Sequence, residues 1–90
     1  MKEYRTGTKV WFIYEYYGVS SKAYIIGNGT IIRHYYVEKD DLYPIYVINS
    51  LDLYPQGIPG EQLFTSEQEA YEALEVQDPK TFNPIRYPKG

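Results

Sequence analysis

The segment Lys9–Tyr17 restricts the possible fold more than any other part of the chain. Its sequence, KVWFIYEYY, is dense in β-branched and aromatic residues, which favour extended strands. Side chains alternate between the two faces of a strand, and both faces are largely apolar here: Val10, Phe12, Tyr14 and Tyr16 share one, and Trp11, Ile13, Glu15 and Tyr17 share the other. We therefore predict a strand that lies at the centre of a sheet or crosses between two layers.

A chain of 90 residues is long enough for one domain. Such a domain has a thin core, because it buries only about 60–65% of the surface that its unfolded chain exposes. The chain has no cysteine for disulfides or zinc–thiolate sites, and a single histidine, His34, excludes an imidazole-rich metal site. The 12 Tyr, three Phe and one Trp remain as the material for a core, since each large ring can bury roughly 150–250 Å². We expect an aromatic core and no cofactor.

Further strands are expected after this first one. Ala23–Ile26 is a short apolar run, and the Gly-Asn-Gly segment Gly27–Gly29 predicts a turn or a bulge, since Gly and Asn tolerate positive φ. Thr30–Val37 predicts a second long strand. The charged segment Glu38–Asp41 is typical of a hairpin tip, so Leu42–Ile48 is expected to return antiparallel.

Prolines and glycines set the limits of these strands. Pro44 is expected at an edge or at the start of its strand, because proline offers no N–H to the ladder. Residues 49–60 (NSLDLYPQGIPG) are expected to be irregular, without a regular interior strand. Glu61–Phe64 is a candidate for one short additional strand.

A short helix is expected over about residues 66–77. Ser66-Glu67-Gln68-Glu69 is a capping box, in which the Ser66 hydroxyl accepts from the N–H of Glu69 and the Glu69 carboxylate reaches back. Asp78-Pro79 ends the pattern. The spacing of three apolar residues predicts a narrow stripe that docks on the barrel: Ala70, Ala73 and Leu74.

Residues 1–78 are therefore assigned to one β domain with its capping helix, and residues 79–90 to an extended, proline-rich tail. The tail contains Phe82, Ile85 and Tyr87. Either these side chains pack back on the domain or they form an exposed peptide. Packing is favoured, because free tails seldom contain three large apolar residues.

Four motifs follow one another in a familiar order: Gly7–Ile13 (GTKVWFI), Gly29–Ile31 (GTI), Tyr46–Ile48 (YVI) and Leu63–Leu74 (LFTSEQEAYEAL). Over roughly residues 7–75 this order resembles small SH3-like barrel proteins of bacteria and their phages, which often end in Leu-Phe-x-Thr-x-Glu-Glu-Ala-x-x-Ala-Leu. Ser66 stands here for the usual Thr and Gln68 for the first Glu. The resemblance implies a mainly β protein, a small SH3-like antiparallel barrel with one short C-terminal α-helix, and it implies little chemistry.

No motif points to catalysis. His34 could act as a general base or pH switch, but it is more simply a strand residue on the wetter face, because no motif places a nucleophile beside it. The carboxylates of Asp40 and Asp41 fall at the expected hairpin tip, where they are solvated, and no serine lies in a Gly-x-Ser-x-Gly elbow. We expect no enzyme, no catalytic residue and no metal ligand.

The surplus of tyrosines is the one unusual feature. A barrel of this size cannot bury all 12 tyrosines, and exposed tyrosines are enriched at protein interfaces and can stack nucleobases. Either the exposed tyrosines are ordinary strand surface or they form a binding surface, for which the candidates are Tyr16, Tyr17, Arg33, Tyr35, Tyr36 and Tyr43. The helix offers a second candidate, an acidic face that could equally be a solubilising surface: Glu67, Glu69, Glu72 and Glu75.

Three binding functions follow from these features. The first is a protein-interaction module, whose partner is another protein or a second copy of the chain paired by a strand edge. The second is nucleic-acid binding, which the net charge of −3 disfavours. The third is an acidic inhibitor of a nucleic-acid-binding protein. Since Met1–Gly7 contains no apolar segment and no run approaches the roughly 20 residues that span a bilayer, we expect no membrane association and a cytoplasmic location, in a bacterium or an infected bacterial host.

Overall fold

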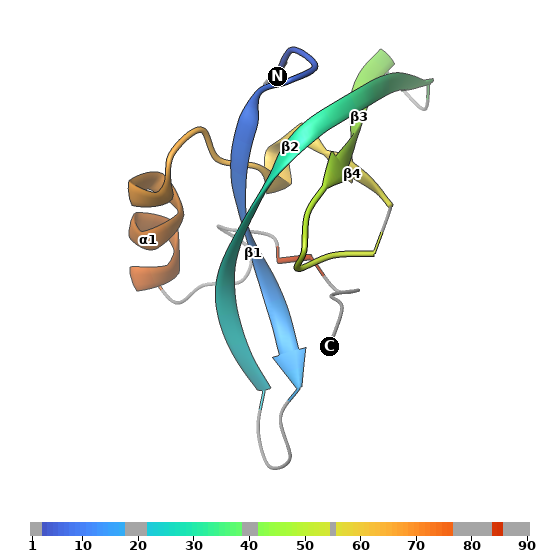
Figure 1. Cartoon of the computed structure of the whole chain (residues 1–90). Coiled ribbons are helices and arrows are strands. Elements are labelled where there is room, and N and C mark those ends of the chain that lie inside the picture. Colours follow the sequence, from blue (N-terminus) through green and yellow to red (C-terminus); the bar gives the residue numbers. More distant parts are fainter. Residues whose placement is uncertain (1–2, 18–21, 39–41, 55, 77–83, 86–90) are drawn as a thin grey trace.

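The computed structural model describes residues 3–17, 22–38, 42–54, 56–76 and 84–85. Four antiparallel strands curl into a half-barrel, and one short helix packs against it (Figure 1). The expectation of a mainly β chain with one C-terminal helix is confirmed. The elements are β1 (Lys9–Tyr17), β2 (Lys22–Glu38), β3 (Leu42–Asn49), β4 (Gly57–Pro59), the 3₁₀-helix η1 (Gly60–Gln62) and α1 (Glu67–Glu75).

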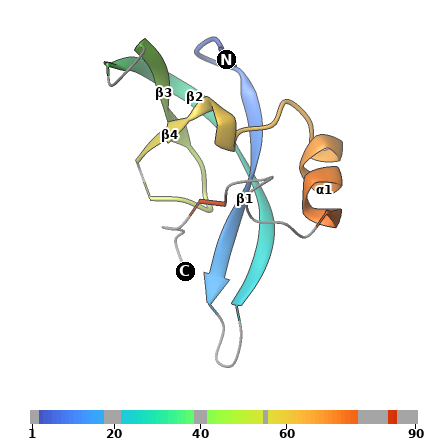
Figure 2. The ribbon, with the colours of Figure 1, turned by 180° about the vertical axis from the view of Figure 1, so that it is seen from behind.

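The long strand β2 shapes the half-barrel, because it pairs with a different strand over each half. The sheet order is β1-β2-β3-β4. Residues 22–30 of β2 pair with β1, and residues 30–38 pair with β3, so that Thr30 lies opposite both Lys9 and Asn49. A β-bulge at Ile32 shifts the register between Ile31 and Arg33. Figure 2 shows the curved β2 running along most of the molecule, from the β1 hairpin to the β3 hairpin.

The turn predicted at Gly27–Gly29 is wrong, because these residues lie inside β2. Their glycines serve a close approach between chain segments. A Cβ on Gly27 would lie 2.8 Å from the Asp52 carboxylate, and one on Gly29 would lie 2.6 Å from the carbonyl oxygen of Asn49. The missing side chains let the segment after β3 lie directly on β2. The alternative expectation of a bulge at these glycines is not met either, because the bulge of β2 lies at Ile32, three residues after Gly29.

Two other predictions around residues 49–64 are corrected. Gly57–Pro59 forms the strand β4, within the stretch expected to be irregular. It tolerates its proline because it has three residues and is the last strand of the sheet. Glu61–Phe64 is not a strand: η1 covers its first part, and only Phe64 pairs, in an isolated antiparallel bridge to Trp11. Pro44 lies near the start of β3, as predicted.

The core lies on both sides of β1. The expected position between two layers therefore fits, but the alternative of a central strand is wrong, because β1 is the first strand in the sheet order. Val10 and Phe12 on one face belong to the larger cluster inside the half-barrel. Ile13 on the other face belongs to a smaller cluster under α1, with Phe64 and the fully buried Ala70. Both faces of β1 are covered by other parts of the domain. This location between two clusters explains why nearly all of its residues are apolar.

The Ser66 half of the capping box is formed as predicted, whereas the reciprocal bond of Glu69 goes to Thr65 and not to the N-cap residue. Ser66 is the N-cap of α1, and its hydroxyl accepts a hydrogen bond from the Glu69 N–H at 3.1 Å. The Glu69 carboxylate reaches back to Thr65, whose backbone N–H and hydroxyl donate at 3.4 and 2.9 Å. The helix ends at Glu75 with Val76 as its C-cap, close to the expected boundary. Gln77 lies outside the described residues.

The tail returns to the domain at Ile85, as predicted. Ile85 is 2% exposed and belongs to the larger core cluster. It pairs with β1 in a parallel bridge: its N–H donates to the Ile13 carbonyl at 2.9 Å, and its carbonyl accepts from the Glu15 N–H at 3.0 Å. Together with Phe64, which exchanges hydrogen bonds with Trp11, it covers the outer edge of β1. Phe82 and Tyr87 lie outside the described residues.

Candidate binding surfaces

The tyrosines predicted to form one surface lie in separate places. Tyr16 lies opposite Ala23 near the hairpin end of β1. Tyr35 and Tyr36 lie in the half of β2 that pairs with β3. In Figure 1 this half of β2 runs away from the end where β1 and β2 meet in their hairpin. These three side chains are between 39% and 50% exposed. The side chains of Tyr17 and Tyr43 lie outside the described part, so the structure brings together only a subset of the predicted residues.

Arg33 and Tyr35 share the outer face of the sheet with Ile32 at the bulge, and we call the surface of Ile32, Arg33 and Tyr35 the Tyr35 face. Ile32 is 52% exposed and Tyr35 is 46% exposed. Tyr35 lies opposite Ile45 on β3, and its hydroxyl reaches over Gly57 on β4, where the missing side chain leaves space for it. The buried side chains of Ile45 and Val47, opposite Tyr35 and Arg33, form the floor of this face.

The helix α1 leaves the Tyr35 face open. It packs against side chains of β1 and of the first half of β2, including Trp11, Tyr24 and Ile26. The Tyr35 face lies over the second half of β2 and over β3. Sequence reasoning missed this grouping, because only the bulge shifts the alternation of β2 and brings Arg33 and Tyr35 onto the face of Ile32.

His34 and Tyr36 lie on the opposite face of β2, in an aromatic row that begins in the core. The Tyr4 and Tyr46 rings meet edge to face with centroids 5.4 Å apart, and the Tyr4 N–H donates to the Tyr46 hydroxyl at 2.7 Å. His34 lies 6.2 Å from Tyr46 and 5.7 Å from Tyr36 between ring centroids. His34 is an exposed residue of β2. Among the described residues, its ring neighbours are the tyrosines Tyr36 and Tyr46, of which Tyr46 belongs to the core.

Burial raises the pKa of three tyrosines. For Tyr4, burial together with the charges of Glu69 and Glu61 and with Tyr46 raises the pKa from 10.0 to about 12. Burial is also the main cause of the raised pKa of Tyr46, which the N–H of Tyr4 partly opposes, and of Tyr14, to which Asp52 contributes. In each case the folded state favours the protonated phenol.

Alkaline pH is therefore expected to destabilise the protein as the pH rises from about 10 to about 12. In this window Tyr4 is ionised in the unfolded chain but protonated in the folded chain, so the unfolded state binds fewer protons and the free energy of unfolding falls with pH. Below pH 10 this contribution is fully present. Urea unfolding at a series of pH values checks the slope, and Tyr4→Phe is expected to reduce it. An unchanged slope in Tyr4→Phe, with Tyr71→Phe as the control for an exposed tyrosine, would contradict the assignment.

The acidic face of α1 is exposed, as its composition suggests, but its four carboxylates are not equivalent. Glu69 is engaged by Thr65 in the cap. Glu72 accepts a hydrogen bond from Gln68 at 3.3 Å on the helix surface. Glu67 and Glu75 are also exposed. The structure places these side chains away from the stripe of Ala70, Ala73 and Leu74, which faces β1 and β2.

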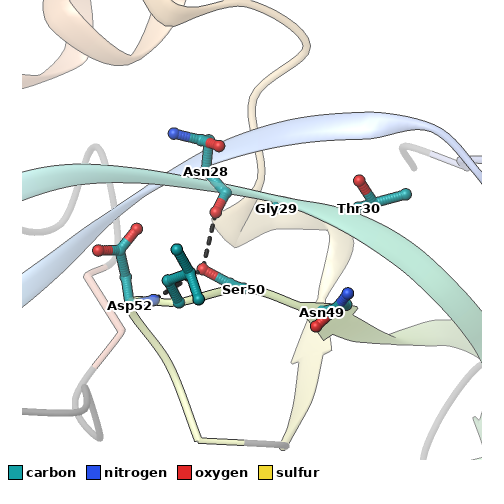
Figure 3. A pocket seen from close by; sticks show the side chains of 7 residues that line it. Asn28, Gly29, Thr30, Asn49, Ser50 and Asp52 are labelled. Atoms are coloured by element: carbon teal, nitrogen blue, oxygen red, sulfur yellow. Dashed lines mark hydrogen bonds between the residues drawn. The ribbon is translucent and has the colours of Figure 1, made fainter.

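A polar pocket of about 310 Å³ lies at the fork where β3 leaves β2 (Figure 3). Its lining consists of Asn28, Gly29, Thr30, Asn49, Ser50, Leu51 and Asp52. The Ser50 hydroxyl donates to the Asn28 carbonyl at 2.7 Å and accepts from the Asp52 N–H at 3.1 Å. The backbone pairing between β2 and β3 ends at Thr30 and Asn49. Beyond that point, the hydrogen bond from the Ser50 side chain to Asn28 holds the segment after β3 against β2.

Sequence reasoning did not find this pocket. The sequence predicts a turn or a bulge at Gly27–Gly29 and an irregular segment beginning at Asn49, and nothing local indicates that the two segments meet. The available signal was the pair of glycines flanking Asn28, since a glycine within a strand marks a close approach of another backbone. Only the register of β2 with β3 shows which segment approaches.

Within the described ranges, no group of three or more His, Cys, Asp or Glu side chains is placed to hold a metal ion. No helix among these residues has the length and apolar character needed to cross a bilayer. Comparisons with models of protein families, with curated proteins and with solved structures give no match to this chain. The geometry alone therefore defines the class: a small antiparallel half-barrel of four strands with one C-terminal helix.

Proposed function

We propose that the protein is a non-enzymatic protein-interaction module that docks a partner protein on the Tyr35 face. The observation that carries the proposal is the exposure of Ile32 and Tyr35, at 52% and 46%, beside Arg33 on one sheet face. Tyrosine and arginine are enriched among the residues that dominate binding energies, and apolar surface exposed in a group favours association. The resemblance to SH3-like barrels of bacteria and phages, and with it a bacterial cytoplasmic location, belongs to the same proposal.

The Tyr35 face is also well suited to docking because it is preorganised. Tyr35 rests on Ile45 and over Gly57, which limits the positions of its ring before any partner arrives. A side chain that is already ordered loses less conformational entropy when it binds. The floor of Ile45 and Val47 belongs to a paired strand, so the surface does not need to form on binding.

A second copy of the chain is one candidate partner, and the structure restricts how it could bind. Pairing through the outer edge of β1 would compete with Phe64 and Ile85, which bond to backbone groups between Trp11 and Glu15. Self-association through the Tyr35 face requires no such displacement. We therefore place a homodimer contact on that face in preference to the β1 edge.

The alternatives receive less support from the geometry. Arg33-His34-Tyr35-Tyr36 would offer a nucleic acid both a cation and aromatic rings, but the bulged strand divides these residues between two faces. The net charge of −3 opposes phosphate binding as well. An acidic inhibitor would use Glu67, Glu72 and Glu75, because Glu69 is engaged in the cap.

Affinity capture with matched tyrosine variants tests the proposal. Tyr35→Ser is expected to lower recovery of the partner from a bacterial lysate about tenfold or more, as truncation of an interface residue worth about 2 kcal/mol does. Tyr71→Ser on α1 is the control, since Tyr71 is 49% exposed and Tyr35 is 46% exposed. Equal recovery by wild type and Tyr35→Ser, or a loss confined to Tyr71→Ser, would sink the proposal.

Light scattering with the same two variants separates the kinds of partner. A dimeric wild type that becomes monomeric only in Tyr35→Ser identifies a second copy as the partner. A gel shift with single- and double-stranded oligonucleotides at low salt tests the alternative, and a shift that Tyr35→Ser leaves intact would favour nucleic-acid binding elsewhere on the molecule.

A further inference from the structure

The polar pocket continues the Tyr35 face. Thr30 and Asn49 line the pocket and lie opposite each other. Val47 lies two residues before Asn49 on β3, so the side chains of Val47 and Asn49 point to the same side of the sheet. Along β2, Tyr35 lies five positions after Thr30, which is on the order of 15 Å at about 3.3 Å per residue. One short extended segment of a partner can therefore contact both.

The pocket contains one charged group, the carboxylate of Asp52. It lies over Gly27, where a Cβ would approach one of its oxygens to 2.8 Å. Asp52 accepts no hydrogen bond and forms no ion pair within the described part of the chain; its backbone N–H alone is engaged, by Ser50. The remaining polar groups of the lining are neutral amides and hydroxyls, from Asn28, Thr30, Asn49 and Ser50.

We propose that this pocket receives the guanidinium group of an arginine side chain from the docked partner, paired with the Asp52 carboxylate. This inference rests on the proposed interaction function and names the chemistry of one contact. A guanidinium is planar, carries five N–H donors and pairs with a carboxylate in a fixed two-point geometry. Asn28, Thr30 and Asn49 line the same pocket with neutral polar groups, so Asp52 is the group that would pair with the cation.

Other ligand chemistries fit the pocket less well. An anion would meet the Asp52 carboxylate without a cation among the lining residues. Lys9, which lies opposite Thr30 on β1, holds its amino group 5.2 Å from the centre of the Trp11 ring. A lysine ligand has only three donors on a compact, strongly hydrated head. Leu51, 94% exposed at the rim, offers apolar surface to the three methylenes of an arginine.

NMR titration of the full chain with N-acetyl-arginine N-methylamide tests the inference. We expect saturable shifts of the amide signals of Asn28, Thr30 and residues 49–52. Asp52→Asn is expected to weaken binding of this probe about tenfold or more, because it removes the charge and keeps the shape. Glu67→Gln, which removes an exposed carboxylate on α1, is the matched control and is expected to bind the probe like wild type.

Two comparisons on the unaltered protein make the test independent of variant folding. The citrulline analogue has nearly the same shape and no charge, so it is expected to bind at least tenfold more weakly. Free arginine, with its charged termini, is expected to bind more weakly than the capped form, since the proposed source is a protein side chain. Equal binding of citrulline, stronger binding of free arginine, or no saturable shift with the capped probe would overturn the inference.

The two proposals can fail separately. Tyr35→Ser is expected to leave probe binding unchanged, because Tyr35 does not line the pocket. If Tyr35→Ser loses the partner while the arginine probe does not bind, the interaction function stands and the arginine contact falls. If Tyr35→Ser retains the partner, the interaction surface falls, and with it the inference built on that surface.

Discussion

Replacing Gly29 by alanine is expected to lower the free energy of unfolding by about 3 kcal/mol, the upper part of the range for overpacking a well-packed site. The added methyl group would lie 2.5 Å from Cγ2 of Ile48 and 2.6 Å from the Asn49 carbonyl oxygen. The second of these neighbours is backbone at the end of β3, so a rotamer change cannot relieve the contact. At roughly 0.05–0.15 kcal/mol per residue, the loss is a substantial part of the stability of such a chain.

Gly27→Ala on the same strand is the matched control. Its methyl group would meet the end of the Asp52 side chain at 2.8 Å and the edge of the Phe12 ring at 3.0 Å. A carboxylate can swing away, so we expect a loss of only about 1 kcal/mol. Urea unfolding of both variants provides the comparison. A Gly29→Ala variant as stable as wild type, or less affected than Gly27→Ala, would show that the Asn49–Asp52 segment does not lie on β2 as described.

The turn expected at Gly27–Gly29 is absent, because these residues lie inside β2. The cause of this difference also shows how far the sequence can predict the fold. A glycine serves either a positive φ or a close approach, and these two uses leave the same local pattern. Among the glycines in the described part of the chain, only Gly7 has a positive φ, at 93°. The approach at Gly29 depends on residues about 20 positions away, and no local pattern carries that information.

Two predictions that rested on interactions between neighbouring residues were confirmed. The Ser66–Glu69 cap depends on neighbouring residues alone, and it formed with the expected hydrogen bond. The two apolar faces of β1 follow from alternation within one strand. By contrast, β4 has three residues and an unfavourable proline, so it exists because β3 offers an edge to pair with. Its own composition could not predict it.

The same distinction applies to the candidate site. The excess of tyrosine predicted that several rings would be exposed, and Tyr16, Tyr35 and Tyr36 are exposed. Which rings share a surface depends on the bulge at Ile32, which shifts the alternation of β2 and which the sequence does not mark. The pocket depends on the register between β2 and β3, so it too could not be inferred from composition.

Replacing Ile85 by alanine is expected to lower the free energy of unfolding by about 3 kcal/mol, within the range of roughly 2–5 kcal/mol for truncating a buried isoleucine. Ile85 is 2% exposed and contacts the same core as Val10, Phe12 and Tyr14. A side chain from the tail thus fills space inside the half-barrel. The cost is expected to approach that of a core residue and to exceed that of a surface contact.

Ile85→Val provides the control, because it removes one methylene and is expected to cost only about 0.5–1.5 kcal/mol. Amide hydrogen exchange gives a second readout, since the N–H groups of Ile85 and Glu15 bond across the bridge to β1. In wild type both are expected to exchange slowly, and in Ile85→Ala both should exchange faster than the N–H of Trp11, which bonds to Phe64. Rapid exchange of Ile85 in wild type, with no loss of stability in Ile85→Ala, would mean that the tail is not part of the folded domain. The outer edge of β1 would then be open between Ile13 and Glu15, and strand pairing with a second copy would become the better account of self-association.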